Sequence, residues 1–267
     1  MSILESIVLG IVQGLTEFLP VSSTGHLVLL QKIFGFPGLE GATDPWLMFF
    51  DTMLHLGTLV AVVAVMRKEI IDLFKKPFRT LWYLVIATIP AVIFSLLFKD
   101  FIDEAFGGAY LGYAFLLTAV ILSLSEVIAK RASRKRELKS GGALTMGVMQ
   151  VVGILPGVSR SGSTISGGIA LGIDREKAAK FSFLMSVPAI LGANLLHGYN
   201  ALKSDMQIQW APAIVGAVCA AIAGYIAVKF MLALIQRKRL YGFAVYVAVL
   251  GVFVLLDQYA LGIINWG

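Results

Sequence analysis

The strongest constraint on the fold is a set of apolar stretches, most of them long enough to cross a lipid bilayer. A transmembrane helix needs about 20 consecutive, mainly apolar residues. Six stretches meet this requirement, at 46–66, 80–98, 110–129, 177–198, 210–235 and 241–264. Two others, 2–35 and 142–172, are broken in the middle by LPVSSTGH and LPGVSRSGST, so each predicts two half-helices that form a re-entrant hairpin.

The composition favours an all-α, polytopic membrane protein over a soluble one. Of the 267 residues, 58% are hydrophobic and only 14% are charged, and the mean hydropathy is +0.85. No low-complexity linker divides the chain, so we expect one integral membrane domain over 1–267. The net charge of +6 does not require nucleic acid as a partner, because the basic residues cluster in short segments between apolar runs.

Clusters of basic residues follow the first, third and fifth predicted spans, and this pattern is typical of cytoplasmic loops. The clusters contain Arg67, Lys68, Lys75, Lys76 and Arg79, then Lys130, Arg131, Arg134, Lys135, Arg136 and Lys139, then Arg237, Lys238 and Arg239. Counting spans from these loops places both termini outside the cytoplasm. The hairpin at 2–35 then enters from the outside and the hairpin at 142–172 from the cytoplasm, so their tips should meet near the middle of the bilayer.

The two halves of the chain share a pattern that predicts an inverted-topology repeat. The run Gly10-x-x-Gln13, followed by Leu-Pro and Ser, recurs as Gly147-x-x-Gln150, followed by Leu-Pro and Ser, with a one-residue slip between the two parts. Each hairpin precedes three spans, an odd number, so the second copy must be inverted relative to the first. We therefore expect one repeat over about 1–135 and another over about 140–267, with a binding site between the broken helices.

Polar side chains concentrate at the two breaks. They are Gln13, Glu17, Ser22, Ser23, Thr24 and His26 around the first break, and Ser159, Arg160, Ser161, Ser163 and Thr164 around the second. Helix N-termini capped by hydroxyl side chains, together with an arginine, are suited to phosphate. Gln13 and Glu17 lie four residues apart on one helix face and offer hard oxygen ligands for a divalent cation. The set therefore predicts a site for a diphosphate and its metal ion.

Structural roles are the alternative for several of these residues. Hydroxyl side chains in apolar helices commonly bond to backbone carbonyls, and His26 alone would serve as an interhelical hydrogen-bonding residue. A charge near the bilayer centre costs roughly 2.5–3.5 kcal/mol on insertion scales. Glu17 and Arg160 therefore indicate function, although a purely structural ion pair between them stays open.

Three further ionisable side chains lie in the apolar runs. Asp51 and His55 are four residues apart at the outer part of the first span, and we interpret them as a pair that supports the first hairpin or touches the substrate. His197 lies near the outer end of the fourth span, and we interpret it as a membrane-interface residue.

At the two breaks the chain closely resembles the undecaprenyl-diphosphate phosphatase family, also called the bacitracin-resistance family. The matching motifs are QGLTEFLPVSSTGH, from Gln13 to His26, and PGVSRSGST, from Pro156 to Thr164. Length, number of spans and motif spacing also agree, so the resemblance covers essentially the whole chain. It implies hydrolysis of the terminal phosphate of undecaprenyl diphosphate to regenerate the carrier lipid of peptidoglycan synthesis, and it implies bacitracin resistance. The family allows Glu or Gln at position 13; because Gln13 cannot act as an acid or base, Glu17 must carry any carboxylate role.

A mechanism consistent with the residues and the resemblance assigns one role to each side chain. Ser23, or else a water molecule, attacks the terminal phosphorus, and His26 transfers the proton. The assignment of Ser23 rests on its place in the family motif, because Ser22, Ser23 and Thr24 are chemically alike. The remaining assignments are Arg160 for charge stabilisation, Glu17 and Gln13 for Mg²⁺ or Ca²⁺, and Thr24, Ser159, Arg160, Ser161 and Thr164 for the phosphate oxygens.

Two other functions are compatible with an inverted repeat. One is a flippase or transporter of the polyprenyl phosphate carrier lipid, and the other is a proton-coupled carrier of small solutes that uses Glu17 and Asp51. The second leaves the hydroxyl-rich turns unexplained. The resemblance implies a bacterial inner-membrane protein in contact with lipid, and a homodimer is compatible with the sequence.

Overall fold

The structure is a computed structural model that describes residues 1–36, 44–98, 101–102, 108–131, 136–203, 207–237, 239–264 and 266, without side chains at 131 and 196–203. Some residues used for the topology prediction lie outside this part of the chain. They are Arg134, Lys135, Lys238, and the side chains of Arg131 and His197. The interpretation of His197 as an interface residue therefore stays a prediction.

In the part of the chain that the structure describes, six helices are long and apolar enough to cross a membrane, and they form the body of the molecule. They are α3 (Pro45–Val65), α5 (Arg79–Leu97), α7 (Leu111–Arg131), α10 (Arg175–Lys203), α11 (Trp210–Arg237) and α12 (Tyr241–Leu256), the last continuing into the π-helical turn η1 (Asp257–Leu261). The short helix α4 (Arg67–Leu73) follows α3. The described residues form no named strand, so the all-α membrane class and the six predicted spans are confirmed.

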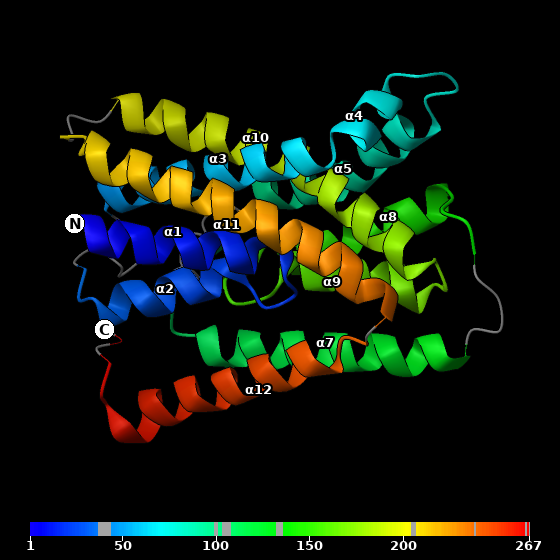
Figure 1. The fold of residues 1–267 in the computed structure, drawn as a ribbon. Helices are drawn as coiled ribbons and strands as arrows, with labels where there is room; N and C mark the ends of the chain where they lie inside the picture. The colour runs from blue at the N-terminus through cyan, green and yellow to red at the C-terminus, as the bar shows by residue number, and fades with distance from the viewer. Residues whose placement is uncertain are drawn as a thin grey trace.

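Both interrupted stretches form pairs of short helices, as predicted. The first pair is α1 (Ile3–Phe18) and α2 (Ser23–Ile33), and the second is α8 (Ser140–Val152) and α9 (Arg160–Ala170). Pro20 directly follows Leu19, the C-cap of α1, whereas α8 already ends at Gly153, three residues before Pro156. A serine hydroxyl caps the start of each second helix. The turns of the two pairs meet in the interior of the molecule (Figure 1), where the Ser161 hydroxyl donates to the Leu19 carbonyl at 2.9 Å. Their re-entrant position in a bilayer and their inverted relation stay predictions.

Small residues let the helices approach closely. A Cβ atom added at Gly10 of α1 or at Gly57 of α3 would collide with backbone carbonyls of α11, those of Gly216 and Ala217 respectively. Helix association in lipid depends on such close packing, because the lipid tails are as apolar as the side chains. α11 is therefore fixed between α1 and α3, and the packing sets the rotation of α1 that places its polar face.

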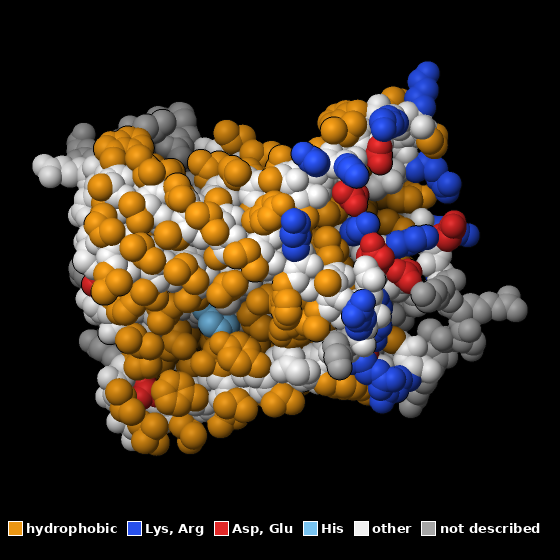
Figure 2. Space-filling model, viewed as in Figure 1, with side chains coloured by type: hydrophobic (Ala, Val, Ile, Leu, Met, Phe, Trp, Pro, Cys, Tyr) orange, Lys and Arg blue, Asp and Glu red, His pale blue; other side chains and the backbone are white. Residues whose placement is uncertain are grey.

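The molecular surface is apolar over most of the face in Figure 2, whereas Lys and Arg side chains gather at one end. That end includes α4 and the beginnings of α5 and α8, which the same view in Figure 1 places together. Many large apolar side chains are more than two-thirds exposed, among them Leu96, Leu195 and Ile263. Such a surface is suited to lipid contact rather than to water.

Candidate active site

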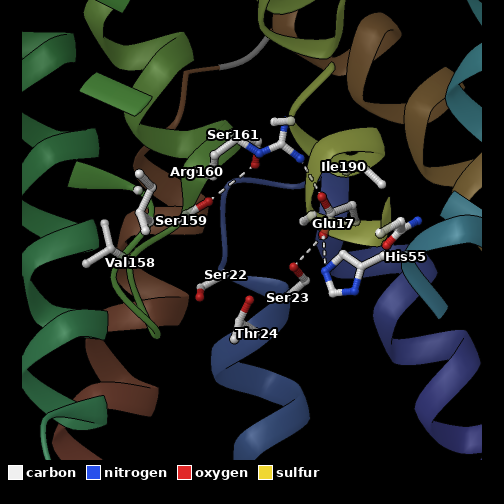
Figure 3. Close-up of a pocket in the computed structure, with 15 residues that line it drawn as sticks. Glu17, Ser22, Ser23, Thr24, His55, Val158, Ser159, Arg160, Ser161 and Ile190 are labelled. Carbon is white, nitrogen blue, oxygen red and sulfur yellow. Dashed lines mark hydrogen bonds and ion pairs between the residues drawn. The ribbon is translucent and has the colours of Figure 1, made fainter. Parts of the chain in front are cut away.

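Glu17 is the centre of a polar cluster between the two helix pairs. Its Oε2 accepts a hydrogen bond from the Ser23 hydroxyl at 2.6 Å and another from the Gln13 side-chain amide at 3.1 Å. Its Oε1 accepts from Nη2 of Arg160, which closes an ion pair between α1 and α9 (Figure 3). The Glu17 side chain is only 5% exposed, so this carboxylate is held by protein groups rather than by bulk water.

Arg160 is the first residue of α9 and retains an unused donor. Its Nη1 is buried and has no hydrogen-bond partner among the described residues. Positive charge at a helix N-terminus is unfavourable for the helix dipole, and the negative charge of Glu17 in the last turn of α1 is unfavourable for the same reason. The ion pair offsets both costs. The same placement favours an anion beside Arg160 and a cation beside Glu17.

The two neighbouring serines at the start of α2 have different surroundings. Ser22 is the N-cap: its Oγ accepts from the backbone N–H of Gly25 at 3.2 Å, and its φ is +70°. Ser23 points toward Glu17 instead, and its hydroxyl group donates a hydrogen bond to the carboxylate. Thr24 also lines the cavity described below. Only Ser23 of these three donates to Glu17, which distinguishes hydroxyl groups that the sequence leaves chemically alike.

His26 lies on a different side of α2 from the carboxylate. Its Nδ1 lies 2.7 Å from the Ser22 carbonyl, so that nitrogen donates, and its Nε2 lies 2.7 Å from the hydroxyl of Tyr246 on α12. The ring stacks on Tyr246 and meets Phe115 edge-on. His26 is not among the residues that line the cavity, so the proton-transfer role predicted for it stays a prediction and this geometry does not bring it to Glu17.

Three hydroxyl groups of the second break, those of Ser159, Ser161 and Thr164, have backbone partners, whereas the buried Ser163 hydroxyl has none among the described residues. Ser159 Oγ caps α9 by accepting from the Gly162 N–H at 3.0 Å, and Ser161 connects the two turns through Leu19. Both serines line the cavity. Thr164 is fully buried, donates to backbone carbonyls of its own helix and lies 2.6 Å from the hydroxyl of Ser182 on α10. The structure thus brings Ser159 and Ser161 to the site, whereas Thr164 packs behind it.

His55 of α3 also reaches the cluster. Its Nε2 lies 3.8 Å from Oε2 of Glu17 (Figure 3), and its Nδ1 lies 2.7 Å from the backbone carbonyl of Asp51. The Asp51 carboxylate accepts from the Gln31 side-chain amide of α2 at 2.9 Å. The predicted pair is therefore divided: Asp51 supports the first hairpin, and His55 faces the site.

A cavity of about 220 Å³ connects these groups. It is lined by Glu17, Ser22, Ser23, Thr24, His55, Gly153, Ile154, Val158, Ser159, Arg160, Ser161, Ala189, Ile190, Ala193 and Asn194. It is smaller than the roughly 300–1,000 Å³ typical of sites for drug-sized ligands, so it suits a compact headgroup. The wall from α10 was not predicted from the sequence; it includes Asn194, whose buried Nδ2 has no partner among the described residues. A polar amide within an apolar run was the available signal.

Comparison with known proteins gives one consistent result. The family model described as bacitracin resistance protein BacA matches residues 6–253. An undecaprenyl-diphosphatase of Carboxydothermus hydrogenoformans is 45% identical over 97% of this chain and 99% of its own length. Undecaprenyl-diphosphatase 3 of Bacillus cereus is 42% identical and the Halothermothrix orenii undecaprenyl-diphosphatase 39% identical, each over at least 96% of this chain and 98% of its own length. The protein whose two broken helices meet at Glu17 and Arg160 therefore belongs to the BacA bacitracin resistance family.

Proposed function

We propose that this protein hydrolyses undecaprenyl diphosphate to undecaprenyl phosphate and inorganic phosphate within the membrane. The observation that carries the proposal is the bonding of one buried carboxylate, Glu17, to both a hydroxyl nucleophile and a phosphate-binding cation. The names of the relatives suggest the substrate, since the three described above are called undecaprenyl-diphosphatases. Removal of the diphosphate would also explain bacitracin resistance, because that antibiotic sequesters it.

The side chains around the cavity suit displacement at the terminal phosphorus. Ser23 attacks, and Glu17 accepts its proton over the 2.6 Å hydrogen bond. Nη1 of Arg160, which has no partner among the described residues, binds an oxygen of the transferring group and stabilises the charge that develops there. The N-termini of α2 and α9 add backbone donors, and Thr24, Ser159 and Ser161 line the same space. Hydrolysis of the phosphoserine by water then restores the enzyme.

We propose that a divalent cation, Mg²⁺ or Ca²⁺, assists the reaction. The described residues contain no group of three or more His, Cys, Asp or Glu side chains that could hold a metal by themselves. Mg²⁺ commonly binds through one or two carboxylates together with substrate phosphates. Glu17 lies at the negative end of α1, and the buried Oε1 of Gln13 has no partner among the described residues, so these two would hold the ion. When bound, the cation supplies charge neutralisation at the diphosphate oxygens.

We infer that the basic end of the molecule faces the cytoplasm, following the positive-inside rule. Both termini then face outward from a bacterial inner membrane, and the first hairpin opens on the outer side.

Equivalent contacts in the two halves of the chain support the inverted repeat. Gly10 of α1 contacts α11, the second span after the second hairpin, and Gly147 of α8 contacts α5, the second span after the first hairpin, each at a backbone carbonyl. The cavity would then lie where the two repeats meet.

Inorganic phosphate release from a polyprenyl diphosphate by the purified protein in detergent tests the proposal. We expect release with Mg²⁺ or Ca²⁺, loss of release with EDTA, and loss in Glu17→Ala and Arg160→Ala. Glu69→Ala is the matched control, because it removes a carboxylate of the basic end that pairs with Lys180. Folding of each variant is checked by its thermal unfolding midpoint.

Two results would contradict the proposal. The first is a folded wild-type protein that releases no phosphate when metal and lipid are supplied. The second is phosphate release that persists in both site variants. In the first case, movement of a fluorescent polyprenyl phosphate across vesicle membranes would decide for the flippase function.

A further inference from the structure

Lys229 lies on the outer, lipid-facing side of α11. It belongs to a row of exposed side chains along that helix, in which Ile222, Ile226 and Phe230 are each more than half exposed. The surface over α11 is mainly apolar in the view of Figure 2. On a helix long and apolar enough to cross a membrane, such a row faces acyl chains. Lys229 therefore places a positive charge on a surface that lipid covers.

The position of Lys229 along α11 is within the hydrocarbon layer and not at its edge. α11 has 28 residues and is about 42 Å long at 1.5 Å per residue, so it exceeds a hydrocarbon core of about 30 Å and each end extends about 6 Å beyond the core. Lys229 precedes the last residue, Arg237, by eight residues, or about 12 Å. Its Cα thus lies about 6 Å inside the core, on the side of the third basic cluster.

The direction of the Lys229 side chain does not carry its charge to the nearer headgroups. Each Cα–Cβ bond of a helix tilts toward the N-terminus, and in α11 this direction leads away from the basic cluster. The ammonium Nζ accordingly lies 4.4 Å from the ring centroid of Tyr225, one turn earlier in the helix. The ion pairs between described residues do not include Lys229. The aromatic ring holds the ammonium group in place, but no carboxylate in the described part of the chain neutralises its charge.

We propose that Lys229 and Tyr225 bind the phosphate of an anionic phospholipid in the leaflet next to the basic end. An unpaired charge in the hydrocarbon is costly, and local thinning of the bilayer, which draws a headgroup inward, lowers that cost. The phosphodiester brings the missing negative charge and accepts hydrogen bonds from the ammonium group. Tyr225 is 39% exposed and adds a phenolic hydroxyl donor. The exposed apolar side chains of the same row then contact the acyl chains.

This lipid site is separate from the candidate active site. The residues that line the cavity at Glu17 include none from α11. The row around Lys229 is open to the surrounding bilayer, where anionic phospholipids gather near basic residues. The occupant is therefore a membrane phospholipid and not the polyprenyl substrate, and the inference does not depend on the proposed hydrolysis.

Binding of dioleoylphosphatidylglycerol to the purified full-length protein, measured by native mass spectrometry, tests the inference. Loss of a charge-assisted hydrogen bond weakens binding roughly tenfold or more, so we expect Lys229→Met to weaken the tightest phosphatidylglycerol site about tenfold. Lys229→Arg should keep the affinity of wild type. Lys75→Met is the matched control, because Lys75 is exposed and already pairs with Asp72. Dioleoylphosphatidylcholine, which has no net charge, should bind equally to wild type and Lys229→Met.

Thermal unfolding in lipid nanodiscs separates lipid binding from a structural role. In phosphatidylcholine nanodiscs the unfolding midpoint of Lys229→Met should equal or exceed that of wild type, because the substitution removes an unpaired charge from the hydrocarbon. Phosphatidylglycerol should raise the midpoint of wild type and Lys229→Arg more than that of Lys229→Met. A lower midpoint of Lys229→Met in both lipids would overturn the inference in favour of a structural role.

Three binding results would also overturn the inference. One is equal affinity of wild type and Lys229→Met for phosphatidylglycerol. Another is the same loss of affinity for phosphatidylcholine as for phosphatidylglycerol. The third is a loss confined to polyprenyl phosphate or to inorganic phosphate, which would assign Lys229 to the carrier lipid or to a free anion. These measurements need no turnover, so they stay decisive even where the proposed phosphatase function fails its own test.

Discussion

Separate substitutions of two adjacent serines, Ser22 and Ser23, test which hydroxyl group is the nucleophile. Ser23→Ala removes the hydroxyl that donates to Glu17, and Ser22→Gly removes the hydroxyl that caps α2. Both changes should leave the fold intact. Alanine is a good helix former at the first position of α2. Glycine accepts the φ of +70° found at Ser22 and replaces a capping serine at a cost of only a few tenths of a kcal/mol.

The expected effects on activity differ by orders of magnitude. In serine hydrolases, removal of the nucleophile lowers kcat by roughly 10⁶, while binding and charge stabilisation preserve roughly 10³–10⁴ over water. Arg160 and Glu17 remain in Ser23→Ala and can still orient a water molecule, so we expect a loss of at least about 10³-fold, or about 4 kcal/mol at 1.36 kcal/mol per decade. Ser22→Gly should stay within about threefold of wild type, because the Ser22 hydroxyl bonds only to the backbone.

The assay is phosphate release in detergent, combined with acid quenching and mass spectrometry of the peptide that contains both serines. Wild type should show phosphate on Ser23 during turnover. Ser23→Ala that retains more than about a tenth of wild-type kcat would refute the nucleophile assignment and favour direct attack by water. Equal losses in both variants would show that the turn, and not one hydroxyl, limits the reaction.

Four further substitutions test the packing of the helices. Gly57→Val should lower the free energy of unfolding by several kcal/mol, because the added Cβ would collide with the backbone of α11. The thermal unfolding midpoint in detergent should therefore fall strongly, and an unchanged midpoint would contradict this packing. Arg175→Met should lower the free energy of unfolding by about 3–5 kcal/mol, because it leaves the carboxylate of Glu126, which is 1% exposed, without its counter-charge. Glu126→Gln leaves no buried carboxylate and should lower it less; a larger loss for Glu126→Gln in denaturant unfolding would refute the reasoning. Tyr246→Phe removes the partner of His26 Nε2 and should cost about 1 kcal/mol with kcat within a few-fold of wild type; a large loss of kcat without loss of stability would favour the predicted proton-transfer role of His26.

The spans and the breaks between half-helices could be predicted because they depend on local properties of the chain. An apolar run of bilayer length has few alternatives to a helix in lipid. A proline followed by a capping serine within a few residues indicates a break between two helices, whereas the isolated Pro90 and Pro188 lie inside α5 and α10. The hydrogen bond between Gln13 and Glu17 follows from their spacing of four residues.

The surroundings of each polar side chain could not be predicted in the same way. Ser22 and Ser23 are adjacent and chemically alike, and Asp51 and His55 share one face of α3, yet in each pair only one member touches Glu17. The helical repeat shows which residues share one face of a helix. It does not show which side chains that face meets, because this depends on contacts with helices distant in sequence.

The sequence by itself determined the helical class, the number of spans and the two motifs to which we assign the chemistry, because hydropathy and helix-breaking residues act locally. Only the tertiary structure decided that Arg160 pairs with Glu17 across 143 residues of chain, that Thr164 packs against Ser182, and that His55 rather than His26 faces the cavity. The physical reason is that close contacts at glycines such as Gly10 set the rotation of each half-helix, and this rotation selects which polar side chains meet.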